Sequence, residues 1–193
     1  MFFDNAQAGV YASDTVWGGA GNDRLEGGGG DEFLNGGSEN DRILGRKGND
    51  TLNGGDQDDT IFAGNGNDVV RGGNGRDMVY LGNGNDHFID ADQTGAFAHD
   101  FVRGGTGNDT LESGGGDDTL SGGAGADVFV FADTSGDRVV TDFTSGSDVI
   151  EVEAAGLSVQ DTDAGLLFGW GNGSILLEGM MAADMQSGDV VFI

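Results

Sequence analysis

Glycine and aspartate recur with a period of nine along residues 18 to 130 of this 193-residue chain. The run opens with GGAGNDRLE at Gly18 to Glu26 and later includes GGTGNDTLE and GGAGADVFV. Twelve units fit one template, with glycine at positions one, two and four, an acidic residue at position six and an apolar residue at position eight. Such self-similarity is typical of a solenoid, because one short unit cannot bury its apolar side chain alone.

Each unit divides into a glycine-rich turn and a strand. Glycine permits backbone angles that other residues avoid, so the first six residues are predicted to form a turn and the last three a strand. One inward side chain between two outward ones is the alternation of a half-buried strand. Two units then make one 18-residue coil of an all-β parallel roll with two sheets and two turn edges. The predicted core comprises Leu25, Leu34, Ile43, Leu52, Ile61, Val70, Val79, Phe88, Val102, Leu111, Leu120 and Phe129.

Position six stacks acidic side chains along each turn edge. The first ladder comprises Asp23, Asp41, Asp59, Asp77, Asp100 and Asp118, and the second Glu32, Asp50, Asp68, Asp86, Asp109 and Asp127. Carboxylates stacked about 4.8 Å apart repel one another unless cations lie between them. Because carboxylate and carbonyl oxygen atoms are the available ligands, multiple calcium ions are favoured over zinc, copper or magnesium. The glycines expected to shape the metal-binding turns include Gly19, Gly21, Gly64, Gly66, Gly73, Gly75, Gly82, Gly84, Gly105, Gly107, Gly114, Gly116, Gly123 and Gly125.

The two ladders differ in their turns. Glu39, Gln57 and Ala98 replace the glycine at position four in units of the first ladder. Arg46 and Ala96 replace glycines at position two. Since the last five units of the second ladder keep the glycine at position four, we expect its ions to be better ordered.

Five extra residues at 90–94 interrupt the repeat and shift both ladders equally. With the next glycine they read DADQTG, which resembles the opening of an EF-hand loop. Phe101 stands where that loop requires a glutamate ligand. We therefore predict a bulging loop and not a complete EF-hand.

Charge and glycine content limit the partners and the folding of the chain. The formal net charge is −26, from 34 acidic and 8 basic residues, which disfavours nucleic acids and anionic membranes as partners. No stretch is apolar enough for a membrane span.

One buried side chain per unit does not offset the entropy of ordering a chain with 40 glycines. The expectation is a disordered chain without calcium and a folded chain with it.

The units GGAGNDRLE, GGTGNDTLE and GGAGADVFV resemble the repeat-in-toxin (RTX, hemolysin-type) calcium-binding repeat, GGxGxDxUx with U apolar. The resemblance covers 113 of 193 residues and implies a right-handed parallel β-roll. It implies calcium between successive turns, held by the aspartates at position six and by turn carbonyl groups. It also implies secretion from a bacterial cell by a type I apparatus.

Residues 131–193 are predicted to form a small β segment that caps the roll and carries a type I secretion signal. We expect strands at 138–143, 148–152, 166–170, 174–178 and 189–193, and a helical turn within 180–186. The region SGDRVVTDFTSGSDVIEVEA resembles the segment that closes the roll in secreted metalloproteases and lipases. That resemblance suggests a further ion at Asp137, Asp142 and Asp148. Residues 1–17 are interpreted as an N-terminal cap coil, because GVYASDTVW at 9–17 fits the template with Asp14 and Val16.

Two outward surfaces carry alternative interpretations. The first combines Leu44, Phe62, Met78, Tyr80 and Phe101 with Arg24, Arg42 and Arg103. This aromatic face suits a polysaccharide or protein partner, but we favour coverage by the C-terminal segment. The second is an array at positions three and five of the second edge, as in ice-binding RTX adhesins; it comprises Asn49, Asn65, Asn67, Asn83, Asn85, Thr106 and Asn108.

These features predict a secreted, extracellular, non-enzymatic calcium-binding protein. His87 and His99 are not expected to act in catalysis, because no HExxH or GxSxG pattern accompanies them. The alternatives are an export module of a larger secreted protease, lipase or mannuronan C5-epimerase, and an adhesin or a polysaccharide- or ice-binding module.

Overall fold

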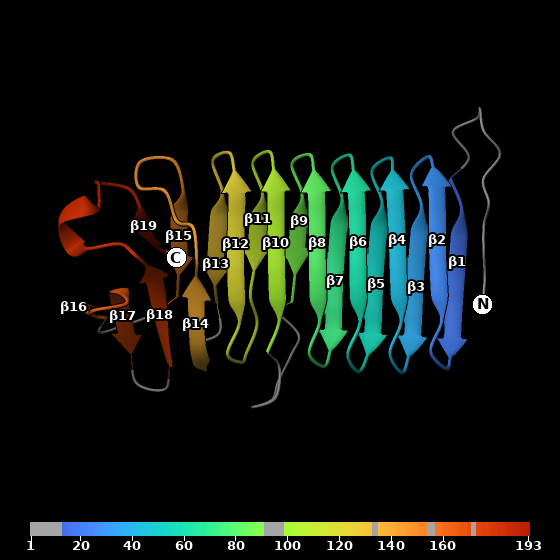
Figure 1. The fold of residues 1–193 in the computed structure, drawn as a ribbon, viewed down its shortest axis with the longest axis horizontal. Helices are drawn as coiled ribbons and strands as arrows, with labels where there is room; N and C mark the ends of the chain where they lie inside the picture. Colours follow the sequence, from blue (N-terminus) through green and yellow to red (C-terminus); the bar gives the residue numbers. More distant parts are fainter. Residues whose placement is uncertain (1–12, 91–98, 133–134, 154–156, 171–172) are drawn as a thin grey trace.

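The structure is a computed structural model that describes residues 13–90, 99–132, 135–153, 157–170 and 173–193. Its strands stack along one axis as successive coils of a flattened roll (Figure 1). A short 3-10 turn, η1 (Ala182–Asp184), is the helical element of these residues. No helix in the described part of the chain is long and apolar enough to cross a membrane.

Two sheets form the broad faces of the roll. The first sheet has nine strands in the order β1 (Thr15–Ala20), β3 (Phe33–Ser38), β5 (Thr51–Asp56), β7 (Val69–Asn74), β9 (His87–Ile89), β11 (Thr110–Glu112), β13 (Val128–Phe131), β15 (Val149–Val152) and β19 (Val190–Phe192). The second has ten in the order β16 (Ser158–Asp161), β17 (Gly165–Trp170), β18 (Gly173–Glu178), β14 (Gly136–Val140), β12 (Thr119–Ala124), β10 (Phe101–Thr106), β8 (Met78–Asn83), β6 (Thr60–Asn65), β4 (Arg42–Lys47) and β2 (Arg24–Gly29).

The pairing is parallel with a constant register through the repeat. Leu34 lies beside Leu52, and Leu52 beside Val70, so each coil advances by 18 residues. Across the insertion Met78 lies beside Phe101, and the register continues unchanged. The predicted all-β parallel roll is confirmed.

The strands are longer than predicted. Most contain six residues, from position seven of one unit to position three of the next, as in Arg24–Gly29. The division into a six-residue turn and a three-residue strand is therefore wrong for these units. Position one continues the strand with its α-carbon facing inward, where a Cβ on Gly45 would lie 2.6 Å from the Ala63 carbonyl oxygen. Glycine is common there because the neighbouring coil and a ladder carboxylate leave little room.

The predicted apolar core is confirmed, since all twelve side chains at position eight are at most 1% exposed. Position one adds Ala63 and Leu81, which are fully buried. These side chains fill the narrow space between the sheets and leave the turn edges to polar groups.

The C-terminal strands extend both sheets at the far end of the roll (Figure 1). β14 and β15 continue the parallel pairing of β12 and β13, and β18 and β19 pair with them in turn. β16, which was not predicted, and β17 add an antiparallel extension. The predicted packing of this segment over the aromatic face is wrong, because its strands hydrogen-bond to the open sheet edges instead.

Candidate metal-binding ladders

The acidic residues at position six form two continuous hydrogen-bonded ladders. The Asp41 N–H donates to Asp59 Oδ1 at 2.7 Å, and the Asp50 N–H donates to Asp68 Oδ1 at 2.7 Å. Across the insertion, the Asp77 N–H likewise donates to Asp100 Oδ1, and the Asp86 N–H donates to Asp109 Oδ1. One oxygen atom of each carboxylate thus holds the turn of the preceding coil, because the register stacks the turns directly.

The second carboxylate oxygen atom is buried along both ladders. No hydrogen-bond donor of the described chain reaches this oxygen in Asp41, Asp50, Asp59, Asp68, Asp77, Asp86, Asp100, Asp109 and Asp127, nor either side-chain oxygen of Glu32. The whole residues are at most 4% exposed. A buried carboxylate oxygen without a donor is costly, so each such atom is suited to a cation.

Burial raises the pKa of the ladder carboxyl groups. It brings the pKa of Asp59, Asp68 and Asp109 to about 7, and that of Asp77 to about 8. Carboxylates of an adjacent coil raise each of these values further, while the backbone N–H bond lowers them. Glu32 also reaches a pKa of about 8. The protein alone therefore does not stabilise charged ladders at neutral pH.

The turns adopt the left-handed backbone conformation that glycine favours. Positive φ values occur at 13 of the 14 predicted turn glycines, namely Gly19, Gly21, Gly64, Gly66, Gly73, Gly75, Gly82, Gly84, Gly105, Gly107, Gly116, Gly123 and Gly125. Gly114 is the exception, and a Cβ there would meet the Asp90 carbonyl oxygen. The repeat spacing therefore located the turn residues, apart from the coil that follows the insertion.

Three residues other than glycine retain this turn conformation. Glu39, Arg46 and Gln57 have φ values of 71°, 85° and 76°. Ala96 and Ala98 lie outside the described residues. The ladder bonds next to Glu39 and Gln57 are intact, at 2.7 Å from Asp23 to Asp41 and 2.7 Å from Asp41 to Asp59. The predicted difference in ion order between the ladders remains a prediction.

Replacing Gln57 with glycine is expected to stabilise the calcium-bound roll by about 1 kcal/mol. A left-handed residue with a Cβ costs roughly 1 to 2 kcal/mol, of which the greater chain entropy of glycine offsets a part. Urea unfolding in saturating calcium measures the change. Gln160→Gly, in the strand β16, is the matched control and is expected to lose stability. A loss in Gln57→Gly equal to that in Gln160→Gly would contradict the strain at position 57.

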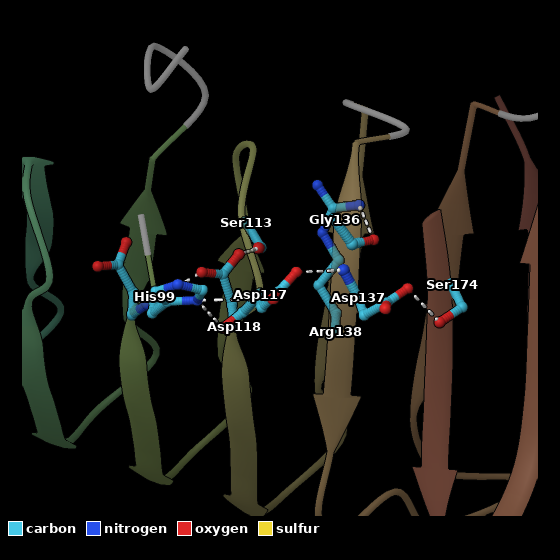
Figure 2. Close-up of polar contacts among 9 residues, drawn as sticks. His99, Ser113, Asp117, Asp118, Gly136, Asp137, Arg138 and Ser174 are labelled. Atoms are coloured by element: carbon cyan, nitrogen blue, oxygen red, sulfur yellow. Dashed lines mark hydrogen bonds and ion pairs between the residues drawn. The ribbon is translucent and has the colours of Figure 1, made fainter. Parts of the chain in front are cut away.

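The first ladder ends at a buried arginine. Register pairs Thr119 with Val139, which places Arg138 where the next aspartate after Asp118 would stand. The guanidinium is fully buried, donates to the Gly114 carbonyl and lies 5.9 Å from the centre of the Phe131 ring. The Ser113 hydroxyl donates to Asp118 Oδ2 (Figure 2). Within the protein, Asp118 therefore already has a hydrogen-bond donor in Ser113 and a positive charge nearby in Arg138.

The further ion suggested at Asp137, Asp142 and Asp148 is not matched by the geometry. Asp148 extends the second ladder by accepting the Asp127 N–H at 3.0 Å. Asp142 accepts two backbone N–H groups, and Asp137 accepts the Ser174 hydroxyl at the other edge (Figure 2). Among the described residues no three acidic or histidine side chains converge on one point. A metal site on these edges would need ladder carboxylates from successive coils together with turn carbonyl groups.

The polar array of the second edge is hydrogen-bonded within itself. The Asn67 N–H donates to Asn49 Oδ1 at 2.7 Å, and Asn83 Nδ2 donates to Asn65 Oδ1 at 2.7 Å. The Thr106 hydroxyl continues this contact to Asn83. These side chains support the turns that carry the second ladder.

Oxygen atoms dominate the chemistry of both edges. The chain has no cysteine, His87 contacts Glu112 on the first sheet, and His99 lies beside Asp117 (Figure 2). Carboxylate and carbonyl groups in a flexible, glycine-rich turn suit calcium, which accepts six to eight oxygen ligands. Zinc and copper prefer nitrogen or sulfur ligands.

Comparison with known proteins agrees with this geometry. A family profile described as RTX calcium-binding nonapeptide repeat (4 copies) matches residues 9–43, 26–61, 35–70, 53–88 and 94–129. No curated protein matches the chain.

Two solved structures are similar to the chain. The AlgE6R3 subunit of the Azotobacter vinelandii mannuronan C5-epimerase is 27% identical, with 72% of this chain and 80% of that one covered and a TM-score of 0.41. The extracellular lipase LipA from Serratia marcescens is 17% identical, with 85% of this chain and 40% of the lipase covered and a TM-score of 0.39.

Proposed function

The chain belongs to the RTX calcium-binding nonapeptide repeat family, and we propose that its two ladders bind several calcium ions that drive folding. The buried carboxylate oxygen atoms that no donor reaches carry this proposal. Divalent cations neutralise the stacked charges and give these atoms a ligand. Binding requires the folded turns, so calcium stabilises the roll against the unfolded chain.

The proposed ligands come from both edges of the roll. They are the carboxylates of Asp23, Asp41, Asp50, Asp59, Asp68, Asp77, Asp86, Asp100, Asp109, Asp118 and Asp127, and carbonyl groups of the turns that the glycines shape. Asp118 is the weakest member, because Ser113 already occupies its second oxygen atom.

We further propose that this folding takes place outside a bacterial cell after type I export. Extracellular calcium modules bind at about 10⁻⁴ to 10⁻³ M, far above cytosolic calcium levels. A chain that stays unfolded without calcium can pass through the export apparatus and fold once it meets extracellular calcium. In this role residues 18–130 form the calcium-binding roll and 131–193 close its C-terminal end. The cap coil predicted at 1–17 falls mostly outside the described residues, which begin at residue 13.

Calcium titration calorimetry tests the proposed function. We expect several calcium ions to bind per chain, with weaker binding of magnesium, which requires a smaller and more regular oxygen cage. Asp68→Asn keeps the acceptor for the Asp50 N–H but removes one charge, so it is expected to weaken at least one site about tenfold. Asp163→Asn removes an equal charge from an exposed turn and serves as control. No heat of binding at millimolar calcium would contradict the proposal.

A second candidate function is binding of an acidic polysaccharide to the aromatic face of the second sheet. Phe62 and Tyr80 stack with their ring centres 4.9 Å apart and their planes within 5°. The Arg42 guanidinium lies 4.7 Å from the centre of the Phe62 ring, and Arg103 lies 5.0 Å from that of Phe101. The rings are partly exposed beside two exposed arginines, and arginine pairs with the carboxylate groups of acidic sugars.

A glycan array tests this candidate. Phe62→Ala and Tyr80→Ala are each expected to reduce binding of acidic polysaccharides at least about tenfold. Trp17→Ala removes an exposed aromatic ring from the first sheet and serves as the control. Equal binding by all three variants would reject the aromatic face as a glycan site.

A further inference from the structure

Asp90 occupies a place that glycine, alanine, leucine or serine takes in the other described units of residues 18–130. Register pairs Val70 with Phe88, which places Asp90 beside Gly72 at position one. The Asp90 N–H donates to the Glu112 carbonyl at 3.0 Å, as expected for a continued strand. The repeat pattern assigned position one to Gly95, which lies outside the described residues. The predicted bulging loop lies, apart from Asp90, outside the described residues, and Asp90 itself is an acidic residue inside the roll.

The Asp90 side chain points toward the first ladder. Asp90 is 4% exposed, and no donor of the described chain reaches its Oδ2. Its carboxyl group lies within hydrogen-bond reach of Asp100, whose own Oδ2 also has no donor. Asp77 and Asp118 contribute further negative potential at Asp90. Two carboxylates, those of Asp90 and Asp100, therefore lie close together on this edge. In the earlier coils of the same edge a single carboxylate lies beside a glycine, as Asp77 lies beside Gly72.

The neighbouring coil does not supply the missing donor. Ser113 directs its hydroxyl to Asp118 Oδ2, and Arg138 donates to the Gly114 carbonyl. Burial and the carboxylates of Asp100, Asp118 and Asp77 raise the pKa of Asp90. The His99 imidazole adds positive potential at Asp100, but its Nδ1 contacts the Asp117 carbonyl oxygen at 3.2 Å. Ser113 and Arg138 therefore interact with Asp118 and Gly114, and the second oxygen atoms of Asp90 and Asp100 are suited to an external cation.

We propose that Asp90 and Asp100 together form a distinct calcium site, the one with the highest affinity on the first ladder. This inference rests on the proposed calcium function and adds a ligand that lies outside the repeat pattern. Additional carboxylate charge tightens calcium binding in oxygen cages. The ion would also fix both ends of the segment 91–99, because Asp90 precedes it and Asp100 follows it.

Calorimetry with calcium alone tests this site in Asp90→Asn and Asp90→Gly variants of the full chain. Asn keeps the side-chain volume without the charge, and Gly restores the residue that earlier coils of this edge carry. Both variants are expected to weaken one site at least about tenfold and to leave the other sites unchanged. Asp163→Asn is the control for loss of one negative charge and is expected to match the natural chain.

The outcomes separate this proposal from the calcium function itself. If either variant folds in calcium and keeps the affinity of every site within about twofold, or binds more tightly, Asp90 is not a ligand and its carboxyl group only shares a proton with Asp100. If the natural chain binds no calcium, the proposed function fails before Asp90 is tested. Circular dichroism in excess calcium confirms that each variant is folded.

Discussion

Without calcium, the chain is expected to gain β structure when the pH is lowered from about 8 to about 5. Burial raises the pKa of Asp59 and Asp68 from 3.8 to about 7, and that of Asp77 from 3.8 to about 8. A raised folded-state pKa means that the roll binds more protons than the unfolded chain. The stability from these groups is thus fully present below the unfolded value near 4 and is lost as the pH rises through 7 to 8.

The effect is large because the ladders contain many such groups. Each group contributes up to about 1.4 kcal/mol per pH unit between its two pKa values. Far-UV circular dichroism in the presence of a chelator measures the transition. Saturating calcium should reverse the trend, since protons compete with the ion for the same oxygen atoms. A calcium-free chain that is more ordered at pH 8 than at pH 5 would contradict this account.

Arg138→Met is expected to destabilise the calcium-bound roll by about 3 to 5 kcal/mol. The guanidinium is fully buried, donates to the Gly114 carbonyl and lowers the pKa that burial raises at Asp118. Methionine fills a similar volume, but it removes the positive charge beside Asp118 and the donor to the Gly114 carbonyl. The substitution therefore removes Arg138 as the partner of the buried Asp118 carboxylate.

Thermal unfolding in saturating calcium measures this loss. For a chain of this length the melting temperature should fall by about 6 to 20 °C. Arg76→Met removes an exposed arginine and is expected to stay within about 0.5 kcal/mol of the natural chain. A melting temperature for Arg138→Met equal to that of Arg76→Met would show that Arg138 does not stabilise the end of the ladder.

The roll, its core and its ladders were predictable because they follow directly from the nine-residue period of the sequence. Apolar residues such as Leu52 and Val70 recur at every ninth position, and strand alternation then fixes which side chains face inward. The same spacing places Asp50 below Asp68. These inferences need no knowledge of the chain outside the repeat.

The strand length was not predictable from glycine content. Backbone freedom alone assigns the glycine at position one to a turn. In the fold, Gly45 faces inward within an extended strand, because a side chain there would approach Ala63 and Asp50. Close packing, and not an unusual φ value, explains this glycine.

Asp90 and Arg138 were missed because their roles depend on three-dimensional register. Counting from the motif places Gly95 at position one, whereas counting from the strand β9 places Asp90 there. Arginine is usually found at the surface, so a buried Arg138 at a ladder position was not expected. The one available signal was its location twenty residues after Asp118, close to the spacing of one coil.

These two residues change the local charge of the first ladder in opposite ways. Asp90 adds a carboxylate to the coil with the insertion, and Arg138 supplies a cation one position beyond Asp118. Calcium dependence should therefore be strongest near Asp100 and weakest at the C-terminal end of that ladder. The second ladder has no comparable substitution among its described residues and continues to Asp148.

Far-UV circular dichroism of the full chain at about pH 7.5, first in chelator and then during a calcium titration, tests the central claim most directly. The account predicts a largely disordered spectrum in chelator and a β spectrum that develops cooperatively as calcium fills the two ladders. A β spectrum that is the same in chelator and in calcium would contradict the claim that these ions drive folding.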